Sequence, residues 1–249
     1  MSALAVMLIA MGIADVTRRL TDRSWVPPVV APAVVVGCAA LAGLWHPGDI
    51  VLLEIAAVAS VAWVILCARA ERTGERVLAP LVVFAAAVGL LILLSGWGSD
   101  VAGLVARWST WAGLPGAGSV DPNGVLMVIG VVLLQMVTGN QLVRLVLGTV
   151  GAIKPAGEPQ ASDRLKGGRL LGPMERLLIL GLGLGGQLAV ATAVVAAKSI
   201  IRFPEINAQR ARENGGIGID EVTEYFLVGS FASWIVALGG VVLTRQLAV

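Results

Sequence analysis

The sequence is poor in charged residues, which make up 14% of its 249 positions. A soluble domain has about 25%. The 18 basic and 16 acidic residues leave a net charge of only +2, which excludes a nucleic-acid binder that relies on positive charge. Hydrophobic residues account for 57%, the mean hydropathy is +0.88, and the apolar residues form long blocks. This composition excludes a disordered chain and argues against a soluble enzyme.

Cysteine and histidine are also scarce, with two cysteines and one histidine. Cys38 and Cys67 both lie inside apolar blocks, so they predict neither a disulfide framework nor a zinc site. His46 stands alone, next to a proline. We therefore expect no metal ion and no cofactor.

Long apolar runs fill most of the chain. A helix needs about 20 apolar residues to cross the hydrocarbon layer. Because the runs show no period-two alternation, they are helices and not barrel strands. We predict an all-α integral membrane protein with about seven transmembrane helices and no soluble domain. The segments are 1–14 (extended to 17), 25–46, 50–68, 77–98, 124–150, 175–197 and 225–244.

Basic residues predict the orientation. No Lys or Arg precedes the first apolar segment, whereas Arg18, Arg19 and Arg23 follow it. This order places the N-terminus outside and predicts an anchor that is not cleaved. Alternating from there, the cytoplasmic side carries 12 basic residues and the outer side five. The prediction is N-out and C-in, as a multi-pass protein of the plasma (inner) membrane. The Ala, Val, Gly and Arg bias indicates a bacterium.

One segment opposes this topology. Residues 198–224 carry four basic residues but fall on the outer side. If this segment is cytoplasmic, either 175–197 or 225–244 is re-entrant, or the first segment does not span.

The chain is expected to have three parts. Residues 1–150 form a five-helix membrane part, in which 99–123 include a short helix on the outer surface. Residues 151–174, rich in proline and glycine, form a cytoplasmic linker. Residues 175–249 form a two-helix membrane part with an amphipathic loop.

Gly181, Gly183 and Gly186 fit the spacing GxGxxG. A dinucleotide site would need a surrounding βαβ unit, whereas these glycines lie in an apolar run of spanning length. We interpret them as a face where helices pack closely.

Polar residues inside the later spans are the candidate ligand contacts. Arg176, Gln187 and Lys198 are eleven residues apart and form one stripe on a straight helix. They can line a substrate path, or the two charged residues can reach the interface while Gln187 bonds a neighbouring helix. Asn140 and Arg144 belong to 124–150, the most polar span.

The segment 168–178, GRLLGPMERLL, resembles the C-terminal signature of a bacterial integral-membrane family known only as a domain of unknown function. AAKSIIRF at 196–203, EYFLVG at 224–229 and GNQLVRLVL at 139–147 are similar to other parts of that signature. The resemblance covers about the last 110 residues. It implies no activity. Capping and anchoring explain part of the signature, but not fully the pairing of Arg169 with Glu175.

Two functions follow as hypotheses. The first is a membrane protein that binds or transports a small anionic ligand, through contacts at Asn140, Arg144, Arg169, Glu175, Arg176, Gln187 and Lys198. The alternative is a non-catalytic scaffold that holds a partner protein or anionic lipid. The expected partners are membrane lipids and a membrane or cytoplasmic protein, not nucleic acid. No catalytic residues are predicted, because no credible acid–base pair is visible.

Overall fold

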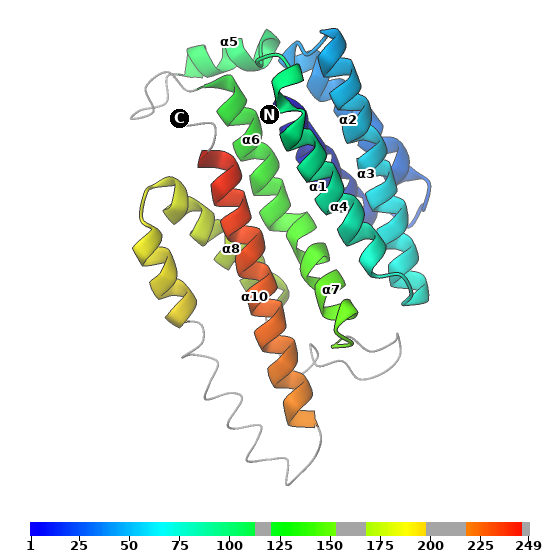
Figure 1. The fold of residues 1–249 in the computed structure, drawn as a ribbon, viewed down its shortest axis with the longest axis vertical. Helices are drawn as coiled ribbons and strands as arrows, with labels where there is room; N and C mark the ends of the chain where they lie inside the picture. Colours follow the sequence, from blue (N-terminus) through cyan, green and yellow to red (C-terminus); the bar gives the residue numbers. More distant parts are fainter. Residues whose placement is uncertain (113–120, 153–167, 198–217, 246–249) are drawn as a thin grey trace. The chain divides into compact units, whose positions relative to one another are not determined.

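The computed structural model describes residues 1–112, 121–152, 168–197 and 218–245. These residues form helices joined by short connections, without any strand (Figure 1), which confirms the all-α prediction. The chain forms two compact units, Met1–Thr138 with Val242–Val249, and Gly139–Val241. We describe each unit by itself. The division at residues 150 and 174 stays a prediction.

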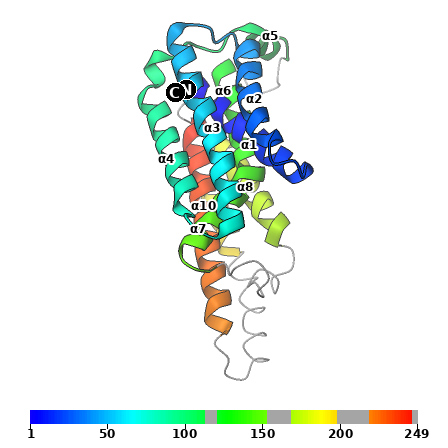
Figure 2. The same ribbon diagram turned by 90° about the vertical axis from the view of Figure 1, so that its right-hand side faces the viewer.

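The first unit is built around helix α1 (Ser2–Leu20). Every residue from Ser2 to Gly12 is buried, because α1 is packed against helices on several sides (Figures 1 and 2). A helix that is apolar all round is a core helix. The neighbours of α1 are α2 (Val26–Ala42), α3 (Pro47–Thr73), α4 (Leu78–Leu93), α6 (Pro122–Leu133) and the π-helix η2 (Leu134–Thr138).

Glycines let α1 and α6 approach closely. A Cβ atom at Gly12 would lie 2.8 Å from the Cβ of Leu133, and one at Gly130 would lie 2.9 Å from the carbonyl oxygen of Ala5. Both distances are shorter than a methyl group tolerates. The two glycines therefore set the spacing of these helices, as small residues do at membrane helix interfaces.

Local sequence fixes the start of two helices. Helix α3 begins with a capping box, in which the His46 backbone N–H donates to the Asp49 carboxylate at 3.1 Å. Helix α6 begins after Asp121, whose carboxylate accepts from the backbone N–H groups of Asn123 and Gly124. Proline occupies the first turn of both helices, where its missing N–H costs nothing.

The predicted surface helix within 99–123 is helix α5 (Gly103–Ala112). It contacts α2 and α6 and lies crosswise to α6 in Figure 1. Trp108 and Trp111 are exposed on it, Trp111 at 83%. A short 3₁₀ turn, η1 (Ser95–Trp97), leads from α4 toward α5.

The second unit contains α7 (Gly139–Thr149), α8 (Gly168–Leu184), a helix at 188–197, and α10 (Gly218–Arg245) up to Val241. The prediction of one span over 175–197 is wrong. Helix α8 ends at Leu184, and the chain turns at 185–187 before the next helix. Gly186 has φ of +75°, a left-handed conformation that ends a helix and that side chains other than glycine disfavour.

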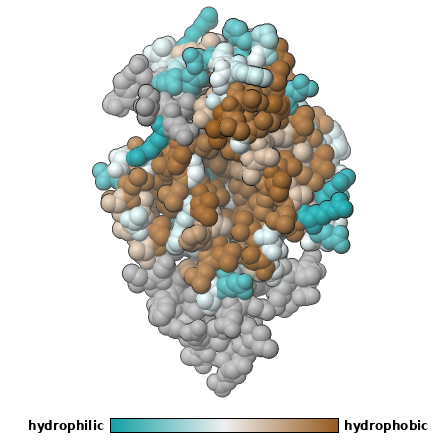
Figure 3. Space-filling model, in the orientation of Figure 1, coloured by the Kyte–Doolittle hydropathy of each residue, from teal (hydrophilic) through white to brown (hydrophobic). Residues whose placement is uncertain are grey.

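Three helices are long and apolar enough to cross a membrane: Pro47–Thr73, Pro122–Thr149 and Thr223–Arg245. Val26–Ala42 and Leu78–Leu93 are apolar but shorter. Large apolar side chains are exposed along the helices, and apolar residues cover much of the visible face (Figure 3). On α10 the exposed ones repeat every three or four residues, at Leu227, Phe231, Ile235 and Leu238. Such a face suits contact with lipid.

Candidate functional site

The guanidinium of Arg176 is the centre of a polar cluster in the second unit. Its side chain is 1% exposed. Nη2 donates to Oδ1 of Asn140 at 2.6 Å, and Nη1 donates to Oγ of Ser233 at 3.1 Å. The three residues come from α8, α7 and α10. The cluster therefore joins three apolar helices through one buried cation and two neutral acceptors.

The preceding residue, Glu175, belongs to the same cluster. Its carboxylate is 9% exposed and accepts a hydrogen bond from Nε1 of Trp234 at 2.9 Å. Trp234 in turn lies against the ring of Phe231, with centroids 6.2 Å apart. The negative charge beside Arg176 lowers the cost of burying the guanidinium.

Gly172 leaves room beside these groups. A Cβ atom there would lie 3.5 Å from Nη1 of Arg176 and 3.7 Å from Oδ1 of Asn140. Gly172, Glu175 and Arg176 are all part of GRLLGPMERLL. This segment therefore supplies residues to a buried polar cluster, and the interpretation of Arg176 as a surface anchor is wrong because its side chain is buried.

The structure brings two of the candidate residues, Asn140 and Arg176, into contact with each other, whereas two other candidates are exposed. Arg144 is exposed on α7, and Gln187 is exposed in the turn after α8. The stripe of Arg176, Gln187 and Lys198 on one helix is therefore wrong, because Gly185 and Gly186 end that helix. Lys198 and the side chain of Arg169 lie outside the described residues.

The glycine motif also needs correction. Gly183 does pack closely, since a Cβ atom there would meet the side chain of Val241 on α10 at 2.5 Å. Around Gly181, however, no atom lies within 4 Å of such a Cβ, and Gly186 forms the turn. Close packing is thus confirmed at Gly183 alone, among the three glycines of the motif.

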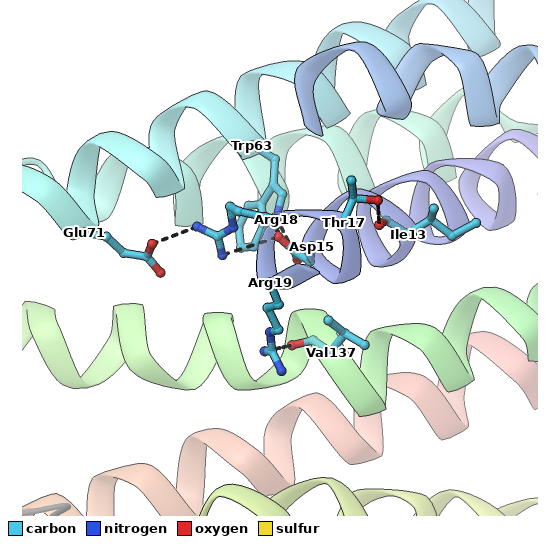
Figure 4. A network of polar contacts seen from close by, with 8 residues as sticks. All are labelled: Ile13, Asp15, Thr17, Arg18, Arg19, Trp63, Glu71 and Val137. Carbon is cyan, nitrogen blue, oxygen red and sulfur yellow. Dashed lines mark hydrogen bonds and ion pairs between the residues drawn. The ribbon is translucent and has the colours of Figure 1, made fainter. Parts of the chain in front are cut away.

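A second polar network lies in the first unit (Figure 4). Asp15 on α1 is 1% exposed, and Nε1 of Trp63 on α3 donates to its Oδ2 at 3.2 Å. Nη2 of Arg18 lies 3.6 Å from Oδ1 of Asp15, while Nη1 donates to Oε2 of Glu71 at 3.0 Å. Asp15 and Arg18 thus form an ion pair within α1, three residues apart in the sequence.

Arg19 extends this network to the π-helix. Its Nη2 donates to the carbonyl oxygen of Val137 at 3.3 Å (Figure 4). A π-helix interrupts the regular i→i−4 hydrogen bonding of the long helix and is often found at functional sites. Gln135 and Thr138, which flank Val137, are fully buried at 0% and 1% exposure. The sequence showed these polar residues but not the change of helix type.

Sequence reasoning missed Ser233, Trp234 and Trp63. Ser233 and Trp234 each carry a side-chain hydrogen-bond donor near the middle of the predicted span 225–244. A polar group at that depth could have marked them as candidates. In the part of the chain that the structure describes, no group of three or more His, Cys, Asp or Glu is placed to hold a metal ion.

Comparison with protein-family models, curated proteins and solved structures finds no match to this chain. The resemblance of 168–178 to a bacterial membrane family stays a prediction.

Proposed function

We propose that this chain is a multi-pass protein of the bacterial plasma membrane with its N-terminus outside. Three helices of spanning length, two shorter apolar helices and their exposed apolar side chains support this. The buried helix α1 contacts α2, α3, α4 and α6 and is followed by Arg23, with Arg18 and Arg19 in its last turn. Arginines after the first apolar segment are retained in the cytoplasm.

Within this membrane protein, the cluster at Arg176 binds a small anionic ligand. The observation that carries the proposal is the guanidinium itself, 1% exposed among apolar helices and bonded to the neutral oxygens of Asn140 and Ser233. A charged side chain inside a membrane helix bundle is costly, and such residues commonly mark a ligand or ion site.

The anion binds by replacing one of the two hydrogen-bond acceptors of the Arg176 guanidinium. A carboxylate or phosphate oxygen makes a charge-assisted hydrogen bond that is stronger than the bond from a neutral oxygen. An incoming anion can therefore take the place of Ser233 Oγ, which lies 3.1 Å from Nη1, more readily than that of Asn140, which lies at 2.6 Å. The missing side chain of Gly172 leaves room of about one methyl group beside Nη1. The planar guanidinium suits two-oxygen anions.

The scaffold alternative predicts a different outcome. A scaffold would hold a protein or anionic lipid through the basic segments 151–174 and 198–224. The cluster at Arg176 would then contribute to stability alone. The two functions therefore differ in whether a small anion stays bound to the intact protein after extraction from the membrane.

Native mass spectrometry of the protein extracted with its own lipids tests the proposal. A small anion is expected on the wild type, absent from Arg176→Gln and weakened in Arg176→Lys, which keeps the charge but not the fork of donors. Arg107→Gln, at an exposed arginine on α5, is the matched control and should keep the ligand. Loss of the cluster's fold is checked by elution volume and melting temperature. A folded Arg176→Gln protein that still carries the anion would overturn the proposal.

A further inference from the structure

The turn at 185–187 closes by its own hydrogen bonds. The N–H of Gln187 donates to the carbonyl of Leu182 at 2.8 Å, and that of Gly186 donates to the carbonyl of Gly183 at 3.2 Å. This is the Schellman pattern of helix ends. The carbonyl of Gln187 then accepts from the N–H of Ala191 at 3.1 Å and starts the next helix. One helix thus ends and another begins with hardly any connecting loop.

The two helices that meet at this turn pack on one another. Ile179 before the turn and Ala191 after it are buried in one apolar cluster with Ala237 of α10. On a single straight helix, twelve residues would separate them by about 18 Å. Leu182 and Val195 pack against the same cluster. The segment is therefore a helical hairpin covered by α10.

The two arms of the hairpin differ in length. Helix α8 has 17 residues (Gly168–Leu184), about 25 Å, and the second arm is described over Leu188–Ala197, about 15 Å. Both are shorter than the roughly 20 residues that cross a 30 Å hydrocarbon layer. A hairpin with these arms turns inside the membrane and returns toward the side from which it entered.

The surface of the hairpin fits that environment. Leu178, Leu184, Leu188 and Val190 are 40–49% exposed. Backbone groups at membrane depth must be hydrogen-bonded or face protein or water, and the Schellman bonds satisfy the donors of Gly186 and Gln187. The apolar arms and the closed turn are both compatible with burial in lipid.

We propose that residues 168–197 form a re-entrant hairpin that enters and leaves the membrane at the cytoplasmic face. The segment 198–224 then lies on the same side as 151–174, and the end of α10 lies outside, opposite to the C-in prediction. The number of membrane-crossing helices falls from seven to six. This inference does not depend on anion binding at Arg176.

The distribution of basic residues supports the hairpin independently of the coordinates. With 175–197 as a full span, the cytoplasmic side carries 12 basic residues and the outer side five. With the hairpin, the same residues divide into 15 inside and two outside, Arg107 and Arg245. Cytoplasmic loops are enriched in Lys and Arg, so the second division agrees better with the rule.

Single cysteines test which segments share a side. In the full chain with Cys38→Ala and Cys67→Ala, the reporters are Ser119→Cys, Ser162→Cys, Ala208→Cys and Ala248→Cys. Intact bacterial cells are treated with a membrane-impermeant maleimide, and then again after permeabilisation. Ser119→Cys and Ala248→Cys should label in intact cells, whereas Ser162→Cys and Ala208→Cys should label only after permeabilisation.

The decisive comparison is between positions 162 and 208. Labelling of both on the same side supports the hairpin whatever the overall orientation, and labelling on opposite sides overturns it in favour of a full span. Labelling in SDS confirms that every reporter is present and reactive. An alkaline phosphatase fused after residue 249 gives a second readout, because it is active only outside the cytoplasm, where the hairpin places it.

Discussion

The indole Nε1 of Trp63 donates to the carboxylate of Asp15 over 3.2 Å and joins α3 to α1 inside the first unit. The carboxylate is 1% exposed and has Arg18 at 3.6 Å. A buried carboxylate is tolerated only with donors and a counter-charge around it. Trp63 and Arg18 supply them from two different helices, so this contact fixes how the core helix α1 sits against α3.

Removing the indole N–H should therefore weaken the first unit. Trp63→Phe keeps an aromatic ring beside Phe84, whose centroid is 5.5 Å away, but removes the indole N–H that donates to the buried carboxylate. We expect a loss of about 1–2 kcal/mol in the free energy of unfolding, measured by SDS titration in mixed micelles. Trp111→Phe, at a residue that is 83% exposed, is the control. Equal stabilities of the two variants would contradict the role of the hydrogen bond.

A methyl group at the α1–α6 contact should be destabilising. The Cβ atom of Gly12→Ala would lie 2.8 Å from the Cβ of Leu133, so the helices must move apart, at a cost of about 1–3 kcal/mol. Gly89→Ala on α4 meets no atom within 4 Å, and alanine is the better helix former by about 1 kcal/mol. The melting temperature should fall for the first and hold or rise for the second. A fall for both would point to a general effect of losing glycine.

Removing one acceptor of the buried guanidinium should destabilise the second unit. Ser233→Ala leaves Nη1 of Arg176 without the hydroxyl at 3.1 Å, and a hydrogen bond to a charged group contributes about 1.5–3 kcal/mol. Ser233→Thr should restore most of the loss. Ser230→Ala, at another buried serine of α10, is the matched control. The midpoint of SDS-induced unfolding measures the loss, and an unchanged midpoint for Ser233→Ala would contradict the contact.

Asp49 is expected to hold the connection between α4 and α5. Its carboxylate accepts from the backbone N–H of Ser99 at 2.7 Å and from its hydroxyl at 2.6 Å, in addition to the His46 N–H. Asp49→Ala removes all three bonds, so the amide of Ser99 should exchange with deuterium faster. Hydrogen-exchange mass spectrometry of peptides covering 95–101 measures this change. Asp100→Ala, which loses a bond from the Asn123 side chain, should leave the Ser99 amide slow; rapid exchange in that variant instead would assign the effect to the loop as a whole.

The lengths of the apolar runs predicted where helices lie, but not whether a run forms one helix or two. The apolar runs of the helices Pro47–Thr73, Pro122–Thr149 and Thr223–Arg245 were visible because hydropathy depends on composition. The turn at 185–187 was not, because an apolar run reads the same whether the helix is straight or bent. Gly185 and Gly186 could indicate either close packing or a helix end, and the sequence alone offered no means to choose.

The polar contacts were also predictable only in part. Asn140 and Arg176 were both predicted as site residues because polar groups inside apolar runs are unusual. Their partner Ser233 is 57 residues beyond Arg176, and Trp63 is 48 residues beyond Asp15. Such pairings are set by tertiary packing, on which a single sequence carries no information. The ion pair of Asp15 with Arg18 was predictable because three residues separate them on one helix.

The Schellman turn also has a consequence for biosynthesis. Its hydrogen bonds join residues no more than five positions apart, so the hairpin can form as soon as residue 197 has left the ribosome. Ile179 and Ala191, however, meet Ala237 only about 40 residues later in synthesis. At a synthesis rate of about 5–20 residues per second, the hairpin is without its cover for several seconds. During that interval the insertion machinery or lipid must shield the face that α10 later occupies, and the second unit is complete only once α10 has packed there.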